Sequence, residues 1–203
     1  MEQFFPFDSI KNAEGKGDRV YKSQHWADYY KNFITTGLMH NNGNTGLAIE
    51  GVENLQLKVG AGGAFIEGRQ YILNETKNIQ FTLEMNEFRR DLLVLRMDNR
   101  INERSIKLHV IQGQPNLSLA NAKRPELIRN ENIYDLGLYE VIIRPQITTI
   151  ATSDITDLRG DAEYCTLSNP KGFGGATIFV GETLPNPQFV KVGDIWMPEI
   201  KEV

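Results

Sequence analysis

The sequence predicts a mainly β protein, with an antiparallel β-sandwich-like module, one N-terminal α-helix and an extended C-terminal arm. Three observations lead to this prediction. Short apolar runs separated by turn residues fill the chain from residue 47 onward, helical spacing is found near the N-terminus, and the last 36 residues hold five glycines and four prolines. We therefore expect residues 1–163 to form the module and residues 164–203 to form an arm or small flap, which packs on the module or on a neighbouring subunit.

The helix is predicted over about residues 23–36, in the stretch "SQHWADYYKNFITTG". Ser23 can cap its start and Gly37 can end it. The aromatic residues recur at helical spacing and form one stripe along it: Trp26, Tyr29, Tyr30 and Phe33. Core packing is the simplest role for such a stripe, and a docking face for another chain is the alternative.

The strands are predicted from runs of about five residues, namely "LAIEGV", "LQLKV", "GAFIEG", "RQYIL" and "IQFTL". Several alternate with period two, so that Leu55, Leu57 and Val59 share a face. Two longer runs flank the polar stretch "DNRINER", which predicts a hairpin. Further strands are predicted at "LGLYEVIIR" and "ITTIAT".

The glycines of "VGAGGAFIEGRQYIL" are predicted to serve turns. Gly60 and Gly63 lie where one strand ends and the next begins, and Gly68 lies where a tight turn favours a positive φ. A phosphate-binding loop leads from a strand into a helix, whereas this stretch leads into another strand and has no Lys-Ser/Thr pair.

Composition excludes several classes of protein. The net charge of −4, with both signs mixed along the chain, is unlike a nucleic-acid or anionic-lipid binder, so we expect neither nucleic-acid binding nor membrane insertion. No signal peptide or membrane span is expected. The single Cys165 fits a protein made in a reducing cytosol, and its thiol is expected to be inert.

No catalytic or cofactor motif is found, so we expect no cofactor, no metal and no enzymatic activity. His25, His40 and His109 are isolated from one another in the sequence. There is no G-x-S-x-G motif for a nucleophilic serine. A small cell-wall hydrolase is kept as an alternative, because such an enzyme requires only two carboxylates that lie about 5–9.5 Å apart in the fold. The candidates for that role are Asp98, Glu103, Asp154, Asp157 and Asp161.

The segment "SDITDLRGD" places Asp157, Arg159 and Asp161 close together in one loop. Arg159 can lock this loop through a forked hydrogen bond to a carboxylate. The alternative is an ion pair between subunits.

Four stretches occur in one order: "GDRVYKSQHWADYYKNFITTGLM", "LQLKVGAGGAFIEGRQYIL", "RRDLLVLRMDNRINERSIKLHVIQGQP" and "IYDLGLYEVIIRPQITTIATSDITDLRGD". Together they resemble the N-terminal module of baseplate and tail-fibre structural proteins in phages and prophages of Gram-positive bacteria. The resemblance covers about residues 5–165. The later stretch "VKVGDIWMP" is also similar to a short element near the ends of such proteins.

This resemblance implies a non-enzymatic virion protein, made in the bacterial host cytoplasm and placed in the tail or baseplate. It implies a homotrimer that acts as an adaptor and holds receptor-binding proteins, with other tail proteins as partners. Because the chain stops about forty residues after the module, we expect an adaptor role rather than direct receptor binding. The competing hypothesis is a carbohydrate-binding module for host cell-wall glycans, which would use exposed Trp or Tyr rings with Asp or Asn.

The apolar ends and the helix stripe are the predicted subunit or partner interface, because symmetric oligomers bury such surfaces between protomers. The candidate residues are Phe4, Phe5, Phe7, Trp26, Tyr30, Phe173, Phe179, Phe189 and Trp196.

Overall fold

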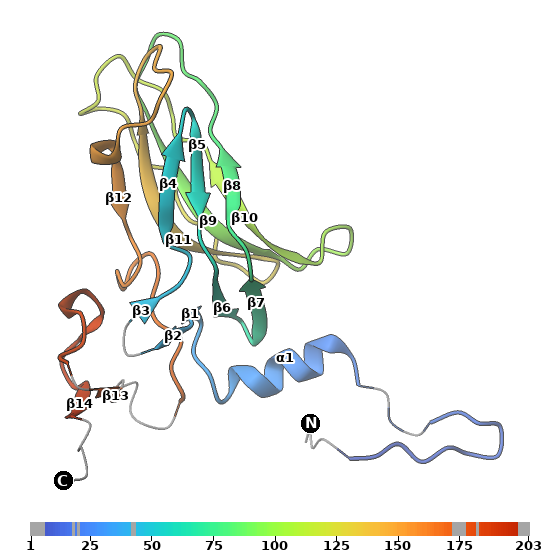
Figure 1. The fold of residues 1–203 in the computed structure, drawn as a ribbon. Coiled ribbons are helices and arrows are strands. Elements are labelled where there is room, and N and C mark those ends of the chain that lie inside the picture. Colours follow the sequence, from blue (N-terminus) through green and yellow to red (C-terminus); the bar gives the residue numbers. More distant parts are fainter. Residues whose placement is uncertain are drawn as a thin grey trace.

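The computed structural model describes residues 7–17, 19, 21–41, 44–171, 178–181 and 183–198. Figure 1 shows an elongated body of strands, with the helix at its base. The N-terminal loop and the C-terminal segment both lie at that end of the molecule. The fold is mainly β with antiparallel sheets, as the sequence predicts, and α1 (Ser23–Lys31) is the only α-helix among the described residues.

The largest sheet has the strand order β10-β9-β11-β12 and is antiparallel throughout. Its strands are β9 (Arg89–Asp98), β10 (Ser105–Ile111), β11 (Ile133–Ile143) and β12 (Ile155–Asp157). The hairpin predicted at "DNRINER" is confirmed, since β9 and β10 pair on either side of it. Residues 92–95 in the middle of β9 form a continuous apolar run, and this part of the strand is buried on both faces.

Two smaller antiparallel sheets follow from the five short runs, whose strands are confirmed. One has the order β4-β5-β8, built from β4 (Ile49–Glu53), β5 (Gln56–Val59) and β8 (Lys77–Gln80). The other has the order β1-β6-β7, built from β1 (Gly37–Leu38), β6 (Gly62–Ile66) and β7 (Arg69–Leu73). The short strands β2 (His40–Asn41) and β3 (Asn44–Thr45) pair with each other, and β13 (Ile178–Gly181) pairs in parallel with β14 (Ile195–Pro198).

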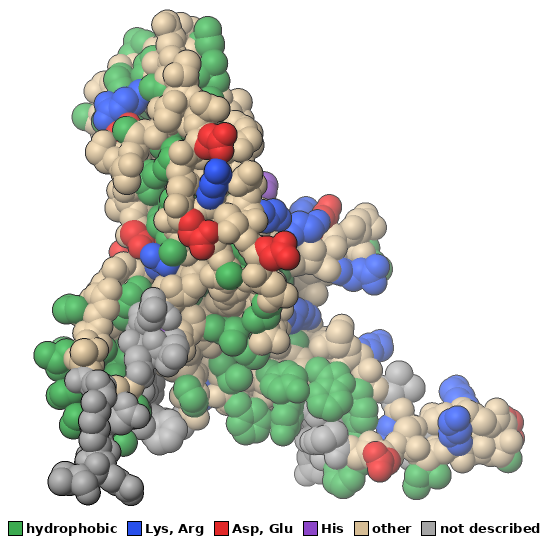
Figure 2. Space-filling view, viewed as in Figure 1, with side chains coloured by type: hydrophobic (Ala, Val, Ile, Leu, Met, Phe, Trp, Pro, Cys, Tyr) green, Lys and Arg blue, Asp and Glu red, His purple; other side chains and the backbone are tan. Residues whose placement is uncertain are grey.

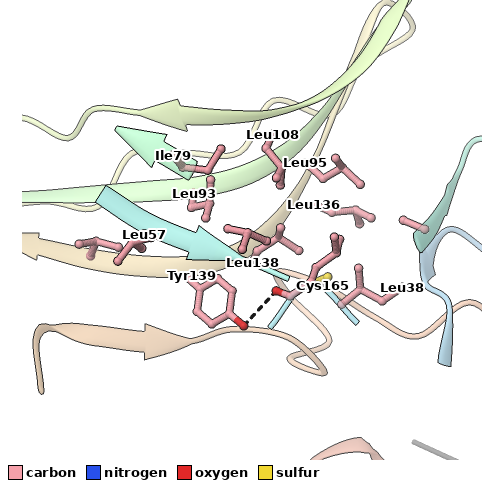
Figure 3. Packing of buried hydrophobic residues seen from close by; sticks show 14 of the residues in the cluster. Leu38, Leu57, Ile79, Leu93, Leu95, Leu108, Leu136, Leu138, Tyr139 and Cys165 are labelled. Atoms are coloured by element: carbon pink, nitrogen blue, oxygen red, sulfur yellow. Dashed lines mark hydrogen bonds between the residues drawn. The ribbon is translucent and has the colours of Figure 1, made fainter. Parts of the chain in front are cut away.

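The main core lies between the large sheet and the strands that cover it. Leu93 and Leu136 of the large sheet and Leu57 and Ile79 of the smaller sheet belong to one buried cluster. Figure 3 shows these side chains pointing toward one another, with the hydrogen bond of Tyr139 at the edge of the group. Alternate residues of β9 face a second, smaller cluster on the other side of the sheet.

The three predicted turn glycines occupy different places. Gly68 lies in the turn between β6 and β7 with φ 77°, a conformation that favours glycine. Gly60 lies between β5 and β6, at the junction of two strands. Gly63 lies inside β6, so the turn predicted for it is wrong, because that strand already begins at Gly62.

The helix is shorter than predicted. It ends at Lys31, five residues before the predicted end, and Gly37 begins β1 instead of ending a helix. Residues 33–38 are drawn into extended pairing with residues 166–171, with Thr35 N–H donating to Asn169 O at 2.9 Å and Leu38 N–H donating to Thr166 O at 2.8 Å. The predicted cap is also wrong: Lys22 occupies the cap position, and Ser23 is the first helical residue.

Two further differences lie toward the C-terminus. The strand predicted at "ITTIAT" is absent, because residues 147–151 contain no strand and the 3₁₀ helix η1 (Thr152–Asp154) follows them. Residues 164–171, expected in the arm, form part of the module instead. Cys165 and Leu167 lie in the main core, and Leu167 bridges to Leu38. The extended pairing with residues 33–38 holds this segment on the module.

Candidate interaction surface

The helix and the turn that follows it present three aromatic side chains to solvent. Trp26 is 37% exposed, Tyr30 43% and Phe33 52%, and we call these residues the aromatic face of α1. The rings of Trp26 and Tyr30 stack with centroids 6.4 Å apart, and Tyr29 contacts Phe33 with centroids 5.0 Å apart. Figure 2 shows hydrophobic side chains gathered over α1. The prediction that this stripe packs in the core is therefore wrong, and the docking-face alternative remains.

The helix reaches the sheets through its opposite side. Ala27 is its only buried residue, and it lies directly over the β6–β7 turn. A Cβ atom added at Gly68 would overlap the carbonyl oxygen of Ala27, so this contact requires glycine. Because only the small Ala27 faces the sheets, the large aromatic rings lie on the solvent side of the helix.

Phe7 and Tyr21 extend the aromatic face toward the N-terminal loop. The N–H of Phe7 donates to the hydroxyl of Tyr21 at 3.1 Å, and the Arg19 guanidinium lies 5.4 Å from the Phe7 ring centre. A hollow of about 560 Å³ lies between Phe7, Tyr21 and Trp26. Phe7 is 58% exposed. Phe4 and Phe5 lie outside the described residues.

The C-terminal aromatic candidates divide into two kinds. Phe179 is 1% exposed, and its ring centre lies 6.1 Å from that of His40. Phe189 packs against the main core of its own chain. Both side chains therefore pack within their own chain, which is one of the two alternatives for the arm, and the buried Phe179 is not available for the predicted subunit interface. Trp196 is 38% exposed and lines an apolar groove of about 410 Å³, whereas Phe173 lies outside the described residues.

Arg159 locks its loop within the chain. Its Nε and Nη2 atoms donate to the two oxygens of Asp157 at 3.0 and 2.7 Å, and Nη1 donates to the carbonyl oxygen of Gly46 at 3.0 Å. The guanidinium also lies 5.2 Å from the centre of the buried Tyr139 ring. Asp161 has a separate role, since its Oδ1 accepts the N–H of Glu163 at 2.8 Å.

The five carboxylates considered for hydrolysis are all engaged in other contacts. Forked arginine pairs hold Asp98 through Arg100, Asp154 through Arg144 and Asp157 through Arg159. The hydrogen bond from Arg100 lowers the pKa of Asp98 to about 2, the opposite of what a general acid requires. Glu103 lies 3.8 Å from Lys107, and Asp161 caps a turn. This arrangement gives the hydrolase hypothesis no support.

Sequence reasoning missed three buried acids in the large sheet. Asp91 and Asp135 are fully buried and Glu140 is 2% exposed. Each is held by arginine: Asp91 by Arg89, Asp135 by Arg96, and Glu140 by Arg90 and Arg124. The sequence does contain a signal for them, because all three acids lie in or beside strongly apolar runs. An acid in such a place is usually buried and paired with a basic residue.

The histidines lie apart from one another. His25 Nδ1 accepts the N–H of Lys22 at 3.3 Å, and His40 Nε2 lies 3.2 Å from Asn169 Oδ1. His109 lies on β10, where burial and then the charge of Arg96 lower its pKa. In the described ranges, no three His, Cys, Asp or Glu side chains lie close enough together to hold a metal ion.

Cys165 gives a first testable prediction. Its side chain is 1% exposed, and burial raises the pKa of its thiol to about 12. At about pH 8, iodoacetamide should leave the folded protein unlabelled but label it fully in denaturing urea, because the thiolate is the reactive species. Mass spectrometry measures the difference. Rapid labelling without denaturant would contradict the buried position of Cys165.

Comparisons with known proteins do not assign this chain to a family. No protein-family model matches the chain, and no curated protein matches it. Among the described residues, no helix has the length and apolar character that a membrane span needs.

Proposed function

We propose that this chain is a non-enzymatic structural component of a phage or phage-like tail tip or baseplate. In this proposal it is a self-associating adaptor, a homotrimer that anchors or positions receptor-binding proteins beside other tail proteins in the virion. The observation that carries the proposal is the aromatic face of α1, with Trp26 and Tyr30 exposed on the helix and Phe33 exposed in the turn that follows it. The ordered resemblance over residues 5–165 supplies the tail setting.

The aromatic face suits an interface on physical grounds. Large aromatic side chains dominate the energetics of protein interfaces when another surface covers them. Here the helix that carries them is fixed by the close contact between Ala27 and Gly68, so the rings are held in place before association. A preorganised surface loses less entropy on binding than a flexible one. Phe7 lies in the same region, beside Tyr21 and Trp26.

We also propose that the module is sandwich-like, with the sheets β4-β5-β8 and β10-β9-β11-β12 as its two layers. The support is the shared cluster that includes Leu57 and Ile79 on one side and Leu93 and Leu136 on the other. Side chains from two inner faces that fill one core are the mark of such packing.

The interface proposal predicts that the double variant Tyr30→Ser/Phe33→Ser self-associates at least about tenfold more weakly than the original chain, because two exposed aromatic rings of the interface are lost. Light scattering after size-exclusion chromatography measures the mass over a concentration series. The matched control is Leu117→Ser, since Leu117 is 79% exposed in the segment after β10 and is not part of the aromatic face. An unchanged mass in the double variant, or an equal loss in the control, would contradict the role of the aromatic face.

A carbohydrate-binding module for host cell-wall glycans is the second candidate, and the exposed ring of Trp196 favours it. The surroundings favour it less. The carboxylate of Asp194 accepts the N–H of Lys191 at 2.9 Å, and Leu184, Pro185 and Pro187 make the rest of the groove apolar. Quenching of tryptophan fluorescence by purified cell-wall glycan, lost in Trp196→Leu, would raise this candidate above the first.

A further inference from the structure

A groove of about 590 Å³, lined by both polar and apolar residues, lies on another part of the molecule. One wall is formed by residues 69–72 of β7. The other is formed by residues 97–99 and 104–106, at the end of β9 and the start of β10, and Ser23 closes one side. We call this feature the edge groove.

Each wall includes an outer strand of its sheet. Strand β7 is last in the order β1-β6-β7, and β10 is first in the order β10-β9-β11-β12. Successive side chains of a strand point to opposite faces, yet four consecutive residues of β7 line the groove. The groove therefore follows the edge of the strand.

The backbone along these edges is available for pairing. Within the part of the chain that the structure describes, residues 69–73 make backbone hydrogen bonds with β6 alone, and residues 105–111 with β9 alone. An outer strand of this kind offers a row of N–H and C=O groups to an added strand. Residues 69–72 of one such row and residues 105–106 of the other line the same groove.

The charge of the edge groove is positive, although the protein carries a net charge of −4. Arg69 donates to the amide oxygens of Gln24 and Asn99 at 2.7 and 3.2 Å, and not to a carboxylate. Arg104 is exposed, and among the described residues no carboxylate lies within salt-bridge distance of it. The one carboxylate on the groove wall, Asp98, is neutralised by Arg100. Figure 2 shows Lys and Arg side chains on the projecting β9–β10 hairpin.

We infer that the edge groove binds an extended peptide segment of a partner protein, rich in carboxylates, as an added β-strand alongside β7 and β10. Backbone pairing with the strand edges would supply affinity, and Arg69 and Arg104 would select acidic side chains. Five residues of β7 span about 17 Å, enough for a segment of similar length. The inference rests on the proposed assembly function and adds to it the chemistry of a second partner.

The test uses three fluorescein-labelled peptides and the full chain. The probes are fluorescein-Val-Glu-Val-Glu-Val-NH₂, its counterpart with lysine in place of each glutamate, and an acidic version with N-methylated backbone amides, each labelled at its N-terminus. Fluorescence anisotropy should show the acidic peptide binding at least about tenfold more tightly than either of the others, because only it has both the charge and the backbone donors. If the N-methylated peptide bound as tightly as the unmodified acidic peptide, charge attraction alone would explain the binding. That result would overturn the inference.

Two variants locate the binding. Arg104 has φ 40°, and Arg104→Asn removes its charge while keeping a residue that tolerates this conformation. It should weaken binding of the acidic peptide at least about threefold, since a charged contact is lost. Lys123→Asn is the control: Lys123 lies beside Gly113 and Arg90, near the opposite end of β9 from Asp98, about 26 Å away along the strand. Equal weakening by both variants would overturn the inference.

The oligomeric state separates this inference from the proposed function. Arg104→Asn should leave self-association unchanged, because Arg104 is not part of the aromatic face of α1. Self-association without selective peptide binding would overturn the groove inference alone. Selective peptide binding by a chain that stays monomeric would support the groove and count against the trimer.

Discussion

Replacing Asp135 with alanine is expected to lower the free energy of unfolding by about 3–5 kcal/mol, the cost of breaking a buried ion pair from one side. Asp135 is fully buried and accepts two hydrogen bonds from Arg96, at 2.7 and 2.9 Å. It also accepts the N–H of Ile128 at 2.9 Å. The variant leaves the Arg96 charge, on a mostly buried side chain, without its partner.

Urea unfolding followed by tryptophan fluorescence measures this loss. The matched control is Glu103→Ala, which removes an exposed carboxylate 3.8 Å from Lys107 and should change the free energy of unfolding by less than about 0.5 kcal/mol. Adding Arg96→Met to Asp135→Ala should recover part of the loss, because no unpaired charge then remains. A loss below about 1 kcal/mol for Asp135→Ala would contradict the buried pair.

Replacing Gly68 with alanine is expected to lower the free energy of unfolding by about 2–4 kcal/mol. Part of this cost is the φ of 77°, which costs a residue with a Cβ about 1–2 kcal/mol. The rest arises because the new Cβ would overlap the carbonyl oxygen of Ala27. Since α1 contacts the sheets here, the helix must move, and the variant should also self-associate more weakly.

Gly15→Ala is the matched control for this prediction. Gly15 has the same φ of 77°, but a Cβ added to it would meet no atom within 4 Å. Its loss should therefore be limited to the conformational cost, at most about 1–2 kcal/mol. Equal losses in the two variants, measured by urea unfolding, would show that the contact between Gly68 and Ala27 contributes nothing.

The strands were predictable because their signal is local. Period-two alternation in "LQLKV" and the turn residues around it are enough to predict β5, and the polar stretch after β9 predicts the hairpin. The end of α1 was not predictable in this way. Residues 33–38 pair with residues 166–171, about 130 positions away, and no local pattern reports such a partner.

The candidate surface was predictable in part. Helical spacing places Trp26, Tyr30 and Phe33 on one stripe, but spacing does not say whether a stripe faces the core or solvent. Its exposure follows from the contact of Ala27 with Gly68, which joins two distant elements. The edge groove could not be predicted, because it depends on how β7 and β10 from two different sheets lie beside each other.

The central claim is that the chain assembles with itself through the aromatic face of α1, and the absolute mass of the purified protein tests it most directly. Light scattering after size-exclusion chromatography, over a concentration series, should give three times the 23.0 kDa of one chain. The fraction of the protein at this mass should fall in the double variant Tyr30→Ser/Phe33→Ser. A mass of one chain at every concentration would contradict the self-associating adaptor.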